Sequence, residues 1–185
     1  MRIGGLVLAA GAGTRFAGGT KQLADLGGRP LLEHALAAIA RLSPRVVVLG
    51  HAAEQILAAV DLQGATPVVC DDWGDGQAAS LRCGVAALGA VDAAVIVLGD
   101  QPRITAEAVA AVAAAAGEAP AVRASYGGRP GHPVLIGRTL LDRVEELTGD
   151  SGFRDLLERV TVFDVDAGGL ADPTDIDTQE ELARL

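Results

Sequence analysis

Aromatic residues are scarce in this sequence: they make up 3% of its 185 residues, with a single tryptophan and a single tyrosine. Hydrophobic residues nevertheless account for 50% of the chain. The core must therefore be built from Ala, Val, Leu and Ile, a composition that suits a parallel sheet covered by helices with small contact residues. At this length we expect one core and a single domain spanning residues 1–185.

The sequence also lacks an excess of basic residues. It has 15 Lys and Arg against 24 Asp and Glu, for a formal net charge of −9. A nucleic-acid surface needs a basic stripe, so this class of partner is not expected. An acidic protein that binds a polyphosphate must concentrate its few cations, together with a metal ion, at the site.

Cysteine is rare, and no long apolar run is present. Cys70 and Cys83 show no C-x-x-C spacing, which argues against a disulfide framework or a zinc site. We expect two buried, unreactive thiols in a reducing compartment. No charge-free apolar stretch approaches the ~20 residues of a membrane helix, and no leader pattern opens the chain. We therefore expect a soluble cytoplasmic protein with no membrane partner.

Glycine, by contrast, is abundant, and it gathers after the first apolar run, at residues 3–8. The loop that follows carries Gly11, Gly13, Gly18 and Gly19, whose backbone N–H groups can approach anionic oxygens closely. Two cations in the same stretch would add full positive charge. The stretch predicts a polyphosphate site. Its candidate nucleotide-binding residues are Leu8, Ala9, Ala10, Gly11, Ala12, Gly13 and Lys21, with Arg15 as the second cation.

Neither common phosphate-binding motif accounts for this loop. The dinucleotide fingerprint needs a glycine at position 16, which is Phe16. A Walker A loop needs Gly-Lys-Ser/Thr, whereas Lys21 lies between Thr20 and Gln22. For the glycines alone, an ordinary glycine-rich turn is the alternative.

Strand and helix patterns alternate along the chain. Short apolar runs predict strands at residues 3–8, 46–49, 67–69, 93–98, 119–124, 134–136 and 160–165. Helical spacing predicts helices at residues 31–39, 53–60, 77–88, 105–116, 138–147 and 152–158, with a last helix at the end of the chain. Residues 126–133 are predicted to form a turn-rich loop. The alternation favours a three-layer α/β fold with a Rossmann-like, mainly parallel sheet flanked by helices.

Two acidic segments are candidates for a metal site. Asp100 follows the most apolar strand, at the sheet edge where such folds bind ligands, and one or two carboxylates suffice to hold Mg²⁺. An aspartate that caps the next helix is the alternative. Near the end of the chain, alternation would place Asp175 and Asp177 on one face of an extended segment. A solvated turn that caps the last helix is the alternative there.

The glycine loop resembles the LAAGxGxRxG…K signature of the MobA-like nucleotidyltransferases, with Lys21 closing it. Gly99-Asp100-Gln101-Pro102 is similar to the GDxP motif by which that family binds its metal. Asp177 matches the second position of the family's (D/N)-x-(D/N)-T-P-E-D-L segment, although Gln179 and Glu181 depart from it. The resemblance implies the nucleotide-diphospho-sugar transferase fold, Mg²⁺ on Asp100 and Asp177, and catalytic roles for Arg15, Lys21 and Asp100.

Three further segments resemble the family. Residues 76–84 are similar to its G-x-(S/A)-x-S-L-x-x-G helix start, which implies that Gly76 and Ser80 lie beside the nucleotide. Gly131-His132-Pro133-Val134 resembles the GHP(V/A) segment of its cytidylyltransferases, so His132 would face the acceptor, unless it is a turn histidine bonded to backbone. Residues 149–154 are similar to the GDxGxR segment, in which Arg154 would neutralise an acceptor phosphate or pair on its own helix.

The resemblance is strongest to the molybdenum cofactor cytidylyltransferases. It implies transfer of CMP from CTP to a phosphorylated acceptor, the molybdenum cofactor, with release of pyrophosphate. Ala10 is the residue that, in the family, goes with CTP over GTP. Two alternatives stay open: an enzyme of the same fold for a sugar phosphate or phospholactate, and a non-catalytic nucleotide-binding domain. Trp73 could stack on a ring or cover the sheet edge.

Overall fold

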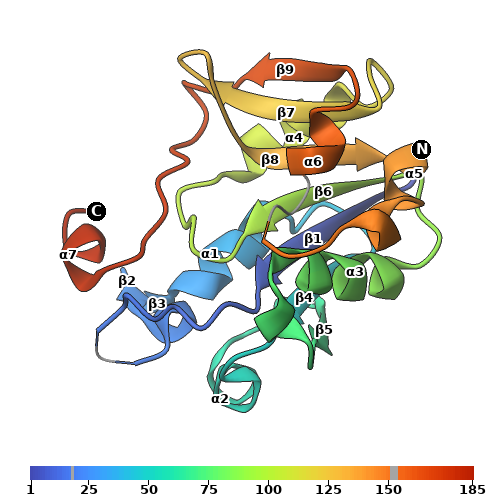
Figure 1. Cartoon of the computed structure of the whole chain (residues 1–185). Helices are drawn as coiled ribbons and strands as arrows, with labels where there is room; N and C mark the ends of the chain where they lie inside the picture. Colours follow the sequence, from blue (N-terminus) through green and yellow to red (C-terminus); the bar gives the residue numbers. More distant parts are fainter. Residues whose placement is uncertain (18, 151–153) are drawn as a thin grey trace.

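The computed structural model describes residues 1–17, 19–150 and 154–185 (Figure 1). Within these residues, the main sheet has seven strands in the order β5-β4-β1-β6-β8-β7-β9. Its strands are β1 (Ile3–Ala9), β4 (Arg45–Leu49), β5 (Thr66–Val69), β6 (Ala93–Leu98), β7 (Ala121–Tyr126), β8 (Arg129–Gly137) and β9 (Val162–Asp166). A small hairpin, β2 (Asp25–Leu26) and β3 (Arg29–Pro30), stands apart from it.

The helices are short; all but the last, which follows β9, lie in the connections between strands. They are α1 (Leu31–Ala38), α2 (Ala53–Ala59), α3 (Gln77–Leu88), α4 (Ala106–Ala114), α5 (Arg138–Leu141), α6 (Arg154–Leu157) and α7 (Gln179–Leu182). Single 3₁₀ turns lie at η1 (Lys21–Leu23), η2 (Trp73–Asp75) and η3 (Val144–Glu146). Thr105 caps α4 by accepting a hydrogen bond from the Ala108 N–H, at 3.1 Å.

The sheet is mainly parallel, as the alternating pattern predicts. β1 pairs in parallel with β4 and β6, β4 does so with β5, and β7 with β9, whereas β8 runs antiparallel to β6 and β7. In the register of the central pair, Leu8 lies opposite Leu98. The loop after β1 and the Gly99–Pro102 segment after β6 therefore leave the same edge of the sheet side by side.

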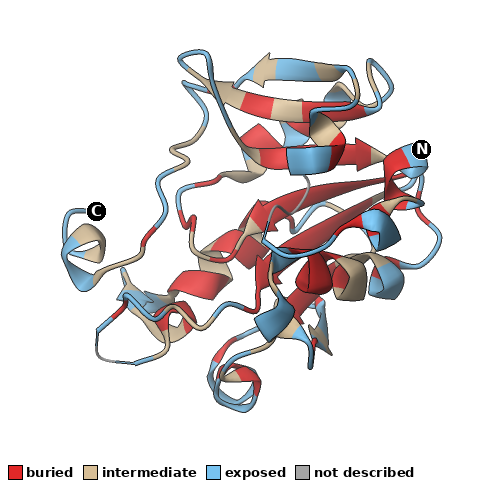
Figure 2. Cartoon of the chain, viewed as in Figure 1, coloured by how far each residue is buried: buried red, intermediate tan, exposed pale blue. Residues whose placement is uncertain are grey.

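Helices cover both faces of the sheet, which gives three layers. Along β1, Val7 and Ala9 pack with α1, α2 and α4, while Leu6 and Leu8 pack with α3 and α5 on the other face. Figure 2 shows the central strands as the buried part of the molecule. A Cβ at Gly84 of α3 would lie 2.5 Å from a methyl of Leu6, so only glycine lets this helix pack so closely. The expected small-residue core is confirmed.

The prediction of a turn-rich loop at residues 126–133 is wrong. β7 and β8 form a hairpin in which Tyr126 pairs with Arg129. Gly127 and Gly128 both have positive φ, +59° and +79°, which is the backbone that a two-residue hairpin turn requires. Helix 138–147 is also shorter than predicted, because α5 ends at Leu141 and a 3₁₀ turn follows. The predicted start of helix 152–158 falls outside the described residues.

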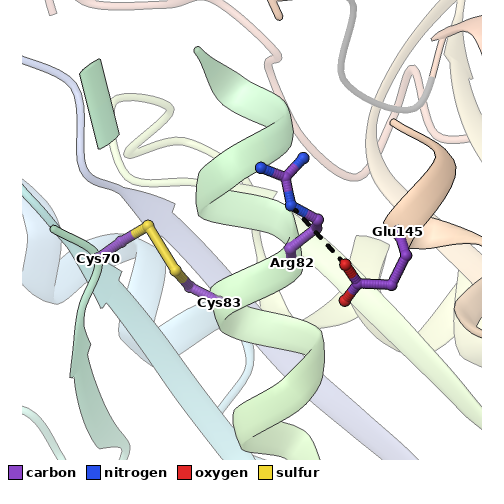
Figure 3. Close-up of a disulfide and its surroundings, with 4 residues drawn as sticks. All are labelled: Cys70, Arg82, Cys83 and Glu145. Atoms are coloured by element: carbon purple, nitrogen blue, oxygen red, sulfur yellow. Dashed lines mark ion pairs between the residues drawn. A yellow bond between two sulfur atoms is a disulfide. The ribbon is translucent and has the colours of Figure 1, made fainter. Parts of the chain in front are cut away.

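The prediction of two free thiols is likewise wrong. Cys70, just after β5, and Cys83, on α3, form a disulfide across a Cα–Cα distance of 6.0 Å (Figure 3). The distance lies in the usual range for such bonds. The separation of 13 residues between the two cysteines does not indicate a disulfide, because only the packing of α3 beside β5 brings their side chains together. Among the described residues, no helix is both long and apolar enough to cross a membrane.

Candidate active site

Lys21 lies at the centre of the polar cluster beyond the ends of β1 and β6. Its side chain is almost fully buried, and its Nζ donates to Asp100 Oδ2 at 2.8 Å and to Asp177 Oδ1 at 3.0 Å. Burial by itself would lower the pKa of Lys21, but the two carboxylates outweigh it and raise that pKa above its usual value. A positive charge is thus held at the sheet edge, where three distant segments of the chain meet.

Arg15 joins the same cluster from the solvent side. Its guanidinium pairs with Asp177 Oδ2 at 2.8 Å, and its side chain is 73% exposed. Arg15 can therefore turn toward an incoming anion, whereas Lys21 is fixed in place. The four predicted residues Arg15, Lys21, Asp100 and Asp177 are brought together as the sequence interpretation requires.

Phe16 explains how the end of the chain reaches this cluster. It is 8% exposed and packs with two fully buried residues, Leu31 and Ile176. The Ile176 N–H also donates to the Asp100 carbonyl at 2.9 Å. Figure 1 shows this last segment running from β9 down to α7, beside β2 and β3. Phe16, which stands where the dinucleotide fingerprint needs a glycine, is thus a core residue that holds the segment around Asp177 against the glycine loop.

Gln22 is a site residue that sequence reasoning missed. It is 5% exposed, and its Nε2 donates to the carbonyls of Ala9 and Gly11, both at 3.1 Å. These bonds hold the loop open, and Gly13, at φ +57°, passes over Lys21. A lone glutamine beside a lysine carries no recognisable signal in a sequence. Gly18, which belongs to the predicted glycine loop, lies outside the described residues.

Two cavities lie against the loop. One, of about 380 Å³, is lined by Leu8, Ala10, Gly11, Trp73, Gly74, Gly76, Gln77, Ser80, Leu98, Asp100 and Asp150. The other, of about 70 Å³, is lined by Leu8, Ala9, Gly11, Gly13, Lys21, Gln22, Gly99 and Asp100. Of the residues predicted to bind the nucleotide, Ala12 lines neither. The larger space is of a size for a nucleoside and the smaller one for phosphate oxygens, and Asp100 borders both.

Close backbone contacts build the wall of the larger cavity. Gly76 has φ +103°, and a Cβ there would lie 2.5 Å from the Gly149 carbonyl carbon. The Ala78 N–H, in the first turn of α3, donates to the Gly149 carbonyl at 3.0 Å. Trp73 packs on Gly50 and meets the ring of His51 edge to face at 5.5 Å. Trp73 therefore both covers the sheet edge and lines the cavity.

A third cavity, of about 990 Å³, adjoins the other two. It shares Leu8, Gln77 and Leu98 with the 380 Å³ cavity. Both residues predicted to face the acceptor, His132 and Arg154, line it. The structure thus brings the predicted acceptor residues to one cavity beside the nucleotide loop.

Arginines supply the positive charge of the third cavity. Arg123, Arg129 and Arg154 line it. Arg123 is paired with Asp164 through two hydrogen bonds, at 2.9 and 3.2 Å. Among the residues that the structure describes, Arg129 and Arg154 have no ion-pair partner. The alternative that Arg154 pairs on its own helix is therefore not observed there, and two guanidiniums are available to an anion.

Two further titratable side chains of this cavity, Tyr126 and His132, are neutral near pH 7, and the carboxyl groups of Glu158 and Asp175 also line it. Burial lowers the pKa of His132 to about 4, against the opposing charge of Asp100. Burial and the charge of Asp172 raise the pKa of Tyr126 to about 12. The Tyr126 hydroxyl donates to the His132 backbone carbonyl at 2.6 Å, which fixes the Tyr126 side chain relative to the backbone at His132.

The donor set around Lys21 fits a divalent cation. Asp100 Oδ1 is buried and has no hydrogen-bond partner among the described residues. Asp177 supplies a second carboxylate, and Mg²⁺ uses one or two carboxylates and completes its shell with phosphate and water. Asp175 is engaged elsewhere, since its Oδ1 accepts from Gln101 Nε2 at 2.8 Å. No group of three or more His, Cys, Asp or Glu that could hold a metal occurs within the described ranges.

Comparison with known proteins assigns the family. A family model described as the MobA-like NTP transferase domain matches residues 5–164. The chain belongs to this family. Its seven-stranded, mostly parallel sheet is the one expected of a nucleotide-diphospho-sugar transferase fold.

The curated relatives of this chain have names that describe different activities. The chain is 31% identical over 193 residues to the nicotine blue oxidoreductase of Paenarthrobacter nicotinovorans, covering 98% of this chain and 95% of that one. It is 43% identical over 111 residues to the bifunctional protein GlmU of Corynebacterium aurimucosum, covering 55% of this chain. The match spans only 23% of GlmU, about a quarter of that protein's length.

One solved structure similar to this chain is a complex with a metal. The structure of Rv0371c of Mycobacterium tuberculosis H37Rv in complex with manganese matches with a TM-score of 0.85 and 29% identity. The match covers 100% of this chain and 98% of that one.

Proposed function

We propose that this protein is a nucleotidyltransferase, a single cytoplasmic domain spanning residues 1–185, that transfers CMP from CTP to a phosphorylated acceptor of the molybdopterin type. One observation carries the proposal. The buried ammonium of Lys21, held by Asp100 and Asp177, lies beside two cavities of nucleotide and phosphate size. A third cavity adjoins them, and it holds two arginines that have no ion-pair partner among the described residues. Neither nucleic acid nor a membrane is a partner in this reaction.

The reaction would be an in-line displacement at the α-phosphorus of CTP. An oxygen of the acceptor phosphate forms the new bond to phosphorus as the bond to the β-phosphate oxygen breaks, and pyrophosphate leaves. Lys21 and Arg15 would hold the phosphates and balance the charge that accumulates on the leaving group. The remaining acceleration comes from holding the two substrates in line, with no covalent enzyme intermediate.

Asp100 and Asp177 would hold Mg²⁺. The unpartnered Oδ1 of Asp100 is the atom that supports this assignment. When bound, Mg²⁺ supplies a Lewis acid and a template for the α-phosphate. Lys21 keeps the two carboxylates together through its hydrogen bonds, at 2.8 and 3.0 Å, and so prevents them from separating by mutual repulsion.

The acceptor would bind in the 990 Å³ cavity. Arg129 and Arg154 would pair with its anionic group, a contact that the protein's own carboxylates do not occupy in the described structure. Apolar side chains such as Leu81 and Ile96 line the same space and suit a ring system. The neutral imidazole of His132 would contact the acceptor without adding charge.

Ala10 would select the base. It is 4% exposed and lines the 380 Å³ cavity together with Trp73 and Ser80. Its methyl group removes space beside the base, which favours a pyrimidine over a purine. Backbone groups at the start of α3 and the Ser80 hydroxyl would hydrogen-bond that base.

Three other functions are separable by experiment. A sister enzyme would use a sugar phosphate or phospholactate, and a non-catalytic domain would bind nucleotide without releasing pyrophosphate. The likeness to an oxidoreductase of almost equal length raises a third possibility, hydride transfer from a dinucleotide. Phe16 opposes it, because the dinucleotide fingerprint needs a glycine at that position.

The test is thermal stability with CTP, GTP, ATP, UTP and NADPH, each with and without Mg²⁺, followed by pyrophosphate release. A ligand that binds only the folded state adds about 2.7 kcal/mol at a hundredfold excess over Kd. We expect the largest Mg²⁺-dependent shift with CTP, and pyrophosphate release once a molybdopterin-type phosphate is added. A shift with NADPH alone would overturn the proposal, and binding without turnover on any acceptor would favour the non-catalytic domain.

A further inference from the structure

The Cys70–Cys83 disulfide lies directly behind the nucleotide cavity. It joins the end of β5 to the middle of α3 (Figure 3). The segment that it encloses, residues 71–82, supplies five of the eleven described residues that line the 380 Å³ cavity. They are Trp73, Gly74, Gly76, Gln77 and Ser80. The disulfide therefore closes a loop, residues 71–82, that forms one wall of that cavity.

Apart from the disulfide, residues 71–76 are held by the packing of Trp73 on Gly50 and by a hydrogen bond from the Asp75 N–H to the Asp72 carbonyl at 2.9 Å, and their other backbone hydrogen bonds are long. The Trp73 N–H reaches the Cys70 carbonyl at 3.3 Å and the Gly76 N–H reaches the Trp73 carbonyl at 3.4 Å, both near the limit for a hydrogen bond. By contrast, α3 is held on both sides of Cys83. Gly84 packs on β1 and β4, and the Arg82 guanidinium donates to the Leu147 carbonyl at 2.6 Å. Loss of the disulfide would therefore loosen residues 71–76 more than it loosens α3.

We propose that Cys70 and Cys83 form a reversible redox site that controls nucleotide affinity, and that its reaction partner is a dithiol reductant. The inference rests on the proposed nucleotide site. These are the only two cysteines in the chain, so no other thiol competes for either one. Disulfides of reducing compartments are usually transient and redox-sensing, so the expected cytoplasmic location would favour a reversible bond.

The exchange has a defined direction. Cys83 is partly exposed, whereas Cys70 is 1% exposed. A thiolate of the reductant therefore attacks the Cys83 sulfur, forms a mixed disulfide there and displaces Cys70 as a thiolate, which takes up a proton. The second thiol of the reductant then attacks its own mixed-disulfide sulfur and releases Cys83. Two electrons and two protons pass to the protein, and the reductant becomes a disulfide.

The test compares one full-length protein in three states: oxidised in air, reduced with dithiothreitol and reoxidised with oxidised glutathione. Thiol titration should find no free thiol in the first state and two in the second. We expect CTP with Mg²⁺ to bind about tenfold more weakly after reduction, within the usual range of coupling between sites, and to recover on reoxidation. Two free thiols in the oxidised sample, or equal affinity in all three states, would overturn the inference.

Two variants distinguish the effect of losing the disulfide from a general loss of stability. Cys83→Ser should bind CTP as the reduced protein does and should no longer respond to dithiothreitol. Val85→Ala, a partly buried position two residues further along α3, loosens the same core but keeps both cysteines. It should keep the full redox response. A Cys83→Ser variant that binds as the oxidised wild type does would contradict the inference.

Hydrogen exchange tests the inference without any nucleotide. Reduction should speed amide exchange at residues 71–76 and leave residues 84–88 of α3 unchanged. If CTP fails to bind in every redox state but this local exchange changes, the proposed function fails and the redox site stands as a conformational switch. If CTP binds and exchange at residues 71–76 does not change, the proposed function stands and the redox inference fails.

Discussion

The two halves of the candidate site are built in different ways. The nucleotide half follows the parallel strands β1 and β6, and its central cation, Lys21, is 7% exposed between two carboxylates. The acceptor half is formed largely by the antiparallel hairpin β7–β8 and by α6, and its arginines at positions 129 and 154 are exposed. A triphosphate is common to the whole family, whereas acceptors differ. The charged side chain at the centre of the nucleotide half is thus fixed by its buried contacts, whereas the exposed arginines of the acceptor half can adopt other conformations.

The largest effect should follow from a change in the nucleotide half. Lys21→Ala removes the cation that balances the leaving group and separates Asp100 from Asp177, so kcat/KM should fall about 10³-fold, as when one fixed electrostatic contact is lost. Pyrophosphate release measures it, and circular dichroism checks that the fold remains.

Arg143→Ala is the matched control for Lys21→Ala. It removes a cation from an exposed pair, 2.8 Å from Glu146, and Arg143 lines none of the three cavities. Its rate should match the wild type. Wild-type turnover in Lys21→Ala would remove Lys21 from the mechanism.

The second effect tests, through its pH dependence, whether His132 of the acceptor half is held neutral. The folded-state pKa of His132, about 4, lies below its ordinary value of 6.5, so protons bind the unfolded chain more readily. The stability that this shift contributes is complete above pH 6.5 and is lost as the pH falls toward 4, by roughly 3 kcal/mol.

His132→Asn should remove this part of the pH dependence. Denaturant unfolding of both proteins at pH 7.5, 6, 5 and 4 gives the measurement, and the difference between them cancels the contributions of the carboxylates. A constant difference across this range would show that the imidazole is not held neutral.

The third effect should separate the two halves. Arg154→Ala, or Arg129→Ala, removes one charge-assisted hydrogen bond to the acceptor, so the acceptor KM should rise about tenfold. The affinity for CTP should stay unchanged. Arg138→Ala, which breaks an exposed pair with Asp142, is the control. Equal losses of CTP and acceptor affinity would mean that the halves are not independent.

The smallest effect concerns the choice of base. Ala10→Gly removes one buried methyl from the nucleotide cavity, and the preference for CTP over GTP should shift by about fourfold toward GTP, the value of one such group. Competition between the two nucleotides in a binding assay measures the ratio. An unchanged ratio would assign base selection to other residues, among them Trp73 and Ser80.

The sequence by itself determined most of the nucleotide half. The spacing of apolar residues along the chain predicted the parallel strands and α3. The helix predicted at residues 77–88 has those bounds in the structure. The glycine loop and Asp100 were readable because each lies directly after a strand, so local order along the chain is enough to put them at one edge of the sheet, and Lys21 closes that loop. Their catalytic roles stay predictions.

Contacts between distant segments needed the tertiary structure. The sequence shows neither that Phe16 holds Ile176 and so brings Asp177 to Lys21, nor that Gln22 supports the loop. The hairpin at Gly127 and Gly128 depends on positive φ at both residues, which a turn-rich stretch alone does not specify. The prediction of two free thiols was wrong for the same reason. Local periodicity follows from backbone geometry, whereas the pairing of Cys70 with Cys83 depends on how α3 packs beside β5.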